Sequence, residues 1–201
     1  MPNCLRLVLI KPSHYDDDGY VIQWFRSAMP SNTLAVLYGL ALDCKQRRVL
    51  GPDADLEITA IDETNAYVNV DRLIRELRDR KSLVALVGVQ TNQYPRSLDM
   101  ARRFRAAGIP VCLGGFHVSG TLAMLPGIQP EVQEAMDLGI SLFAGEAEGR
   151  FEQVLLDAWH GTLQPRPASK LVMVPPVRLM REAGNSGEGT PSSEGMSSMK
   201  L

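Results

Sequence analysis

Leu83-Val84-Ala85-Leu86-Val87-Gly88-Val89 is the most continuously apolar stretch of this 201-residue chain. A strand without polar alternation is buried on both of its faces, as strands of a parallel sheet are when helices cover both sides. The stretch therefore predicts an α/β fold built on a parallel sheet.

Strand and helix patterns alternate on both sides of this stretch. We expect four further strands, at residues 5–10, 56–61, 109–113 and 140–144, and five helices, near residues 31–46, 71–80, 95–107, 131–138 and 149–160. The alternating polarity of residues 56–61 is typical of an edge strand. Together the patterns predict a doubly wound, five-stranded parallel sheet with the flavodoxin-like strand order 2-1-3-4-5.

The first helix has the clearest boundary signals. Ser31 or Asn32 can cap its amino end, because a side-chain oxygen there accepts a hydrogen bond from a free backbone N–H. Four residues at helical spacing are expected to face the sheet, namely Leu34, Leu37, Tyr38 and Ala41. The long loop before this helix contains Trp24 and Phe25, which we expect to pack on a surface.

Composition limits the classes of function. The chain has 21 Lys and Arg against 23 Asp and Glu, a net charge of −2, so it lacks the basic excess of a nucleic-acid-binding protein. No apolar run approaches the length of a membrane span, and the first residues lack a signal-peptide pattern. We therefore expect a cytoplasmic protein with neither a nucleic-acid nor a membrane partner.

The chain divides into two parts of different character. We expect one domain at residues 1–162, followed at 163–201 by a Pro-rich linker and a tail. Half of residues 184–201 are Gly or Ser, so this tail has too little apolar surface to order itself. Within the linker, residues 171–174 could add an edge strand.

The spacing of the cysteines and of the acidic residues predicts no metal site. Cys4, Cys44 and Cys112 are far apart and odd in number, which argues against a disulfide framework. The run Asp16-Asp17-Asp18 lacks the alternating acids and the distal Glu of a calcium loop, so a solvated turn is expected. The prediction is that no residue of the chain ligates a metal ion.

Two glycine-containing stretches follow successive strands about thirty residues apart. Gly114-Gly115-Phe116-His117 follows the strand at 109–113, and Gly145-Glu146-Ala147-Glu148 follows the strand at 140–144. With Lys11-Pro12-Ser13 after the first strand and Pro30-Ser31-Asn32-Thr33-Leu34 before the first helix, residues 4–162 resemble a known domain. This is the N-terminal cobalamin-binding domain of the cobalamin-dependent radical S-adenosylmethionine (radical SAM) enzymes.

The resemblance implies a cobalamin site at the carboxyl ends of the strands. Glycines there would let the main chain approach the corrin or its nucleotide tail, and hydroxyl or amide groups would hydrogen-bond the ligand. The implied cofactor-binding residues are Ser13, Thr91, Asn92, Gly114, Gly115, His117, Gly145 and Glu146. The alternative is that Gly-Gly and Gly-Glu are ordinary turn residues.

His117 is the candidate side chain for ligating cobalt. The best-known cobalamin signature is Asp-x-His-x-x-Gly after the first strand, whereas here Gly115 replaces the aspartate and the motif follows the fourth strand. The imidazole therefore lacks the carboxylate that would fix its tautomer. We expect His117 to hydrogen-bond the ligand or to cap the loop, without a bond to cobalt.

Glu146 and Glu148 could act as an acid and base pair. A structural role is favoured, because carboxylates at a helix amino terminus satisfy free backbone N–H groups.

The family's catalytic parts are missing. Radical SAM enzymes hold a 4Fe-4S cluster with Cys-x3-Cys-x2-Cys, and no two cysteines here lie closer than forty residues. The cluster, S-adenosylmethionine and the barrel would belong to full-length relatives or to a partner chain. We expect a cofactor module that is not catalytic alone. The alternatives are a flavodoxin-like ligand-binding or interaction domain without cobalamin, and a decayed gene product.

Overall fold

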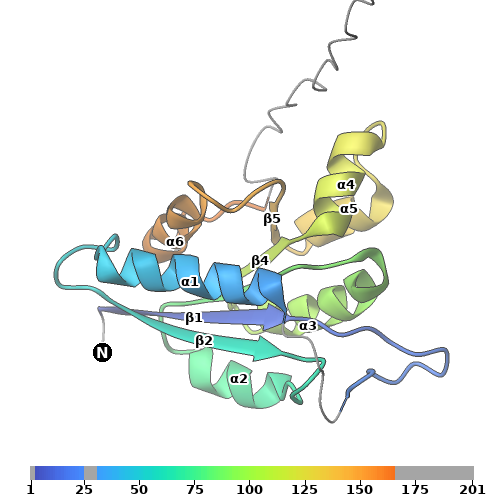
Figure 1. Cartoon of the computed structure of the whole chain (residues 1–201), viewed down its shortest axis with the longest axis horizontal. Helices are drawn as coiled ribbons and strands as arrows, with labels where there is room; N and C mark the ends of the chain where they lie inside the picture. Colours follow the sequence, from blue (N-terminus) through green and yellow to red (C-terminus); the bar gives the residue numbers. More distant parts are fainter. Residues whose placement is uncertain (1–2, 25–30, 166–201) are drawn as a thin grey trace, which may run out of the picture.

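A computed structural model describes residues 3–24 and 31–165 (Figure 1). Its five strands are β1 (Cys4–Lys11), β2 (Asp55–Asp62), β3 (Ser82–Leu86), β4 (Val111–Gly114) and β5 (Ser141–Phe143). They form one sheet in the order β2-β1-β3-β4-β5, with every neighbouring pair parallel. The expected fold class and strand order are confirmed, and β2 is an edge strand.

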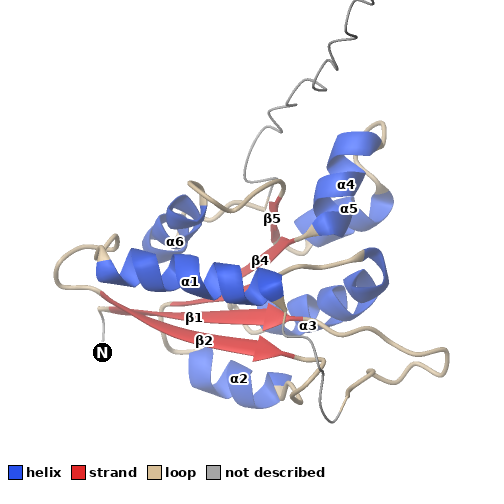
Figure 2. Cartoon of the chain, viewed as in Figure 1, coloured by secondary structure: helices blue, strands red, loops and turns tan. Residues whose placement is uncertain are grey.

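Helices cover both faces of the sheet. They are α1 (Asn32–Gln46), α2 (Val70–Leu77), α3 (Tyr94–Ala106), α4 (Phe116–Met124), α5 (Pro130–Asp137) and α6 (Phe151–His160), and a short 3-10 helix, η1 (Thr91–Gln93), precedes α3. Figure 2 shows α1 and α6 on one side of the sheet and α2 and α3 on the other. The described residues thus contain one α-helix more than the five expected.

Each face of the sheet has its own apolar core, because successive side chains of a strand point to opposite faces. Leu5, Leu7 and Leu9 of β1 pack with buried residues of α1 and α6. Val8 and Ile10 of the same strand lie in the second core with buried residues of α2, α3, α4 and α5. All five residues of β3 are buried, as its continuous apolar sequence predicts.

Most boundary signals act as expected. The Ser31 hydroxyl caps α1 by accepting a hydrogen bond from the Leu34 N–H at 3.2 Å. Leu37 and Ala41 of α1 are buried against the sheet, but Tyr38 is 38% exposed. The prediction for Tyr38 is therefore wrong: it lies beside the buried stripe and not within it.

The loop after β1 is held by polar contacts. One carboxylate oxygen of Asp16 accepts hydrogen bonds from the backbone N–H groups of Asp18 and Tyr20, at 3.1 and 2.7 Å, so the acidic run forms the expected solvated turn. Trp24 is 62% exposed, contrary to expectation, although its backbone N–H donates to the Thr64 carbonyl. Phe25 and Pro30 lie outside the described residues.

Three further expectations concern metal-binding side chains, membrane-spanning helices and the carboxyl-terminal tail. Across residues 3–24 and 31–165 no group of three or more His, Cys, Asp or Glu side chains is placed to hold a metal ion. Over the same ranges, no helix combines the length and the apolar character needed to cross a lipid bilayer. The expected edge strand at 171–174 and the tail lie outside the described residues.

Candidate functional site

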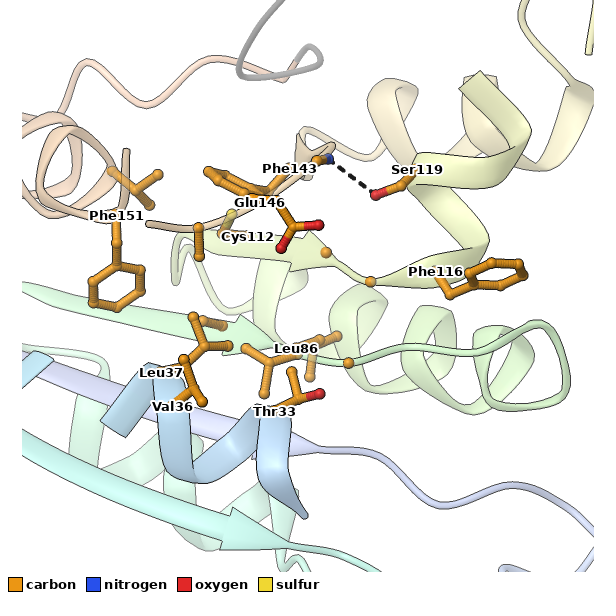
Figure 3. A pocket seen from close by; sticks show the side chains of 18 of the residues that line it. Thr33, Val36, Leu37, Leu86, Cys112, Phe116, Ser119, Phe143, Glu146 and Phe151 are labelled. Carbon is orange, nitrogen blue, oxygen red and sulfur yellow. Dashed lines mark hydrogen bonds between the residues drawn. The ribbon is translucent and has the colours of Figure 1, made fainter. Parts of the chain in front are cut away.

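A crevice of about 550 Å³ opens at the carboxyl ends of β3, β4 and β5 (Figure 3). One wall is the first part of α1, with Asn32, Thr33, Val36 and Leu37, and the opposite wall is the start of α6 with Phe151 and Val154. The three strand ends and the loops that follow them supply the rest. Ligands of open α/β sheets bind at this edge, so the crevice is the candidate site.

The walls of the crevice are mainly apolar. Besides the residues of α1 and α6, the lining includes Ala85, Leu86, Val87, Cys112 and Phe143. Burial raises the pKa of the Cys112 thiol to about 12, so at neutral pH this side chain is a small apolar wall residue and not a nucleophile. Such walls suit a flat, weakly polar group more than a charged one.

Gly115 joins the loop after β4 to the loop after β3. Its φ is +148°, and a Cβ atom built on it would lie 2.1 Å from the backbone nitrogen of Val89 and 2.6 Å from its carbonyl oxygen. Two backbone hydrogen bonds fasten the same contact: the Val89 N–H donates to the Gly114 carbonyl at 3.2 Å, and the His117 N–H donates to the Val89 carbonyl at 3.0 Å. Glycine is therefore required here by the chain itself, whatever ligand binds nearby.

Gly145 places the loop after β5 against α4. Its φ is +87°, in the left-handed region that glycine adopts without strain, and its N–H donates to the Ser119 hydroxyl at 3.0 Å. A Cβ on Gly145 would meet only the end of the flexible Arg150 side chain. The space around Gly145 therefore restricts a side chain less than the space around Gly115 does.

The charged groups of the crevice are acidic. Glu146 and Glu148 line it, and no Lys, Arg or His is among the described residues of its lining. Figure 3 shows the Glu146 carboxylate pointing into the crevice from the loop after β5. Arg150 lies beside the lining: it donates a hydrogen bond to the Ala144 carbonyl at 2.9 Å, and its guanidinium lies over the Phe143 ring.

The structural role expected for Glu146 is not observed. Arg150 is the N-cap of α6, and no side chain caps that helix end. The Glu146 carboxylate makes no hydrogen bond or ion pair within the described parts of the chain, so it satisfies no free N–H of α6. It is left available to a ligand.

Of the eight residues expected to bind a cofactor, the structure brings four together at the crevice: Gly114, Gly115, Gly145 and Glu146. Ser13, Thr91, Asn92 and His117 do not line it. Ser13 is buried, where its N–H donates to the Glu63 carboxylate at 3.0 Å and its hydroxyl to the Ile22 carbonyl. Thr91 and Asn92 lie in η1, and Asn92 is exposed.

His117 lies in the first turn of α4 and not in a loop. Its ring packs on Tyr94 with 4.2 Å between ring centroids, and its Nδ1 is 3.5 Å from the Thr91 hydroxyl. Its Nε2 is buried without a hydrogen bond, 3.6 Å from a Glu131 carboxylate oxygen. Burial lowers the pKa of His117, and the nearby Glu131 opposes this only in part. The imidazole therefore belongs to the contact between α3, α4 and α5.

The two helical walls of the crevice were not predicted from the sequence. Val36 is 48% exposed beside the buried stripe of α1, while Phe151 and Val154 are buried residues of α6. The one available signal was Val36, an apolar residue of α1 outside the stripe that faces the sheet.

No family model, curated protein or solved structure matches the chain. The fold and the crevice are therefore the evidence for a function.

Proposed function

We propose that the chain binds cobalamin at the crevice between α1 and α6. The observation that carries this proposal is an apolar crevice at the carboxyl edge of the sheet, lined by both glycine stretches that resemble the cobalamin-binding domain. The aromatic base of the nucleotide tail would enter between the apolar walls. The corrin, which is too large for the crevice, would rest over its rim.

The size and chemistry of the crevice are compatible with this ligand. A volume of about 550 Å³ falls in the range of small-molecule sites and suits a nucleotide-sized group. Apolar side chains such as Val36, Phe143 and Phe151 would contact the flat faces of the base. Gly114 and Gly145, which carry no side chain at the rim, would leave room for the bulky corrin.

The protein would contribute orientation and shielding, without a histidine on cobalt. His117 lies outside the crevice lining, among Tyr94, Thr91 and Glu131. The bound corrin would supply methyl transfer or assistance to a radical reaction. In this proposal a 4Fe-4S cluster and S-adenosylmethionine would come from a radical SAM barrel or a partner chain.

A flavin mononucleotide is the less favoured ligand for this fold. Its phosphate monoester carries close to two negative charges at neutral pH, and the crevice presents Glu146 and Glu148 without a lining Lys or Arg. Like charges at this range oppose binding. The phosphodiester of cobalamin carries a single negative charge and would meet less repulsion.

Binding can be tested by equilibrium dialysis of the full chain against hydroxocobalamin, read by its visible absorbance. Val36→Trp would fill the crevice from an exposed position, so we expect at least tenfold weaker binding, or about 1.4 kcal/mol. Leu42→Trp is the matched control, because Leu42 is a 37% exposed residue of the same helix outside the lining. The control should bind as the unmodified chain does.

Two results would contradict the proposal. The unmodified chain would show no bound cobalamin, or Val36→Trp and Leu42→Trp would weaken binding equally. The spectrum of bound cobalamin should also keep its shape in His117→Ala, because His117 lies outside the crevice lining.

A further inference from the structure

Two of the polar groups around the crevice are already hydrogen-bonded within the protein. The Ser119 hydroxyl accepts the Gly145 N–H, and the backbone N–H of Gln90 donates to the Gln93 side chain at 3.0 Å. Glu146 differs from both. Its carboxylate points into the crevice and, in the part of the chain that the structure describes, has no partner (Figure 3).

An ionised carboxylate can only accept hydrogen bonds. Glu146 is exposed, so water hydrates its carboxylate in the free protein, and no basic side chain is among the described residues that line the crevice. A ligand that displaces this water has to supply a donor in its place. A phosphate in that position would be repelled, and an apolar group would strip water from the charge without replacing its hydrogen bonds. The group that fits is a neutral donor, a hydroxyl or a primary amide.

We propose that Glu146 is a specificity-determining residue that accepts a hydrogen bond from a hydroxyl or primary amide of the bound ligand. This inference rests on the proposed cobalamin site and adds to it the chemistry of one contact. Cobalamin has two sources of such a donor, the ribose hydroxyl of its nucleotide tail and the amide side chains of its corrin. Cobinamide keeps most of the amides and lacks the tail, so it separates the two sources.

The test is the affinity of the full chain and three variants for hydroxocobalamin and for cobinamide. Hydrogen bonds to charged groups contribute more than neutral ones, so Glu146→Ala should weaken cobalamin binding about tenfold. Glu146→Gln should recover part of the loss, because its amide oxygen still accepts. Glu152→Ala is the matched control, since it removes an equal charge from the start of α6 but lies outside the crevice lining; its effect should stay below about twofold.

Each outcome has a defined meaning. A loss in Glu146→Ala with cobalamin alone assigns the donor to the nucleotide tail, and an equal loss with cobinamide assigns it to a corrin amide; both support the inference. Normal binding by Glu146→Ala, or equal losses in Glu146→Ala and Glu152→Ala, overturns it and leaves the cobalamin site standing. Absence of cobalamin binding by the unmodified chain overturns the proposed function and this inference with it.

Discussion

The two halves of the carboxyl edge of the sheet differ in how their polar groups are used. At the ends of β1 and β2, the Glu63 side chain is buried, with 1% exposed. Its carboxylate accepts hydrogen bonds from the Ser13 N–H and from two nitrogens of Arg96. At the ends of β3, β4 and β5 the walls are apolar and the Glu146 carboxylate has no partner among the described residues. The first half is closed by its own side chains, and the second is open.

The difference shows which strand ends are available to a ligand. A polar residue at a strand end marks a binding site only when its hydrogen bonds are not already made within the protein. Ser13 is committed to Glu63 and Ile22 and cannot turn to a ligand without leaving buried groups unpaired. The closed half therefore supports the fold, and the open half is the one left for function.

The largest effect is expected from Gly115→Ala, at the backbone contact under the open half. A Cβ there would overlap the backbone of Val89 at 2.1 Å and would force alanine into a φ of +148°. Strain and overpacking together should cost about 3–5 kcal/mol of unfolding free energy, measured by urea denaturation. Ligand binding would fall because the crevice itself is distorted.

Gly120→Ala is the control for this change. Gly120 lies inside α4, and a Cβ atom built on it meets nothing within 4 Å, so alanine should stabilise the protein by about 0.5–1 kcal/mol. Equal urea midpoints for Gly115→Ala and the unmodified chain would show that the two loops do not touch as described.

The closed half can be opened by Arg96→Ala. The Arg96 side chain is 14% exposed and lies 2.6 Å from Glu63, so its loss leaves a buried carboxylate without its counter-charge. We expect a loss of about 3 kcal/mol in urea denaturation. Cobalamin affinity of the folded fraction should not change, because Arg96 and Glu63 lie outside the crevice lining.

Two further variants test whether the loss in Arg96→Ala comes from an unpaired buried charge. Arg72→Ala removes an exposed ion pair with Glu76 within α2 and should cost less than about 0.5 kcal/mol. The double variant Glu63→Gln with Arg96→Met removes both charges and should lose less than Arg96→Ala alone. Similar losses of unfolding free energy in Arg72→Ala and Arg96→Ala would show that burial does not make the Arg96–Glu63 ion pair more important than an exposed one.

The smallest effect is expected from pH, through His117 behind the crevice. Its pKa in the folded state is lowered from 6.5 by burial, so the folded protein favours neutral imidazole and binds a proton less readily than the unfolded chain. The stabilisation is fully present above pH 6.5 and is lost as the pH falls through the lowered pKa. The melting temperature should therefore drop between pH 7 and pH 5.

His117→Phe keeps a ring against Tyr94 and should remove this part of the pH dependence. Glu131 on α5 faces the imidazole and favours its charged form, so Glu131→Gln should steepen the drop. An identical pH profile for His117→Phe and the unmodified chain would contradict the assignment.

The fold was accessible from the sequence because its signals are local. A continuous apolar β3, alternating strands and helices, and Ser31 before α1 each depend on neighbouring residues. The helix that was missed, α4, lacks these signals. Its N-cap residue is Gly115, which offers no side chain to cap it, and it contains Gly120 and leaves Phe116 and Met124 exposed.

The site was accessible only in part. Glycines at strand ends could be found because the ends of parallel strands share one edge. The orientation of Ser13 depends on Glu63, which lies fifty residues away in the sequence. The orientation of His117 depends on Tyr94, which lies on another helix. Likewise, Val36 lines the crevice because of the way α1 and α6 lie across the sheet, and no local pattern encodes that.

The backbone contact between Val89 and Gly115 also bears on how fast a ligand could come and go. The Val89 N–H is bonded to Gly114 at the end of β4, and the Val89 carbonyl to His117 at the start of α4, so the backbone on both sides of Gly115 is held in place before any ligand arrives. A ligand would then bind without a prior conformational change of this backbone. None of its affinity would be lost to a low population of the binding-competent conformation. Related ligands should then associate at similar rates and differ mainly in their residence times.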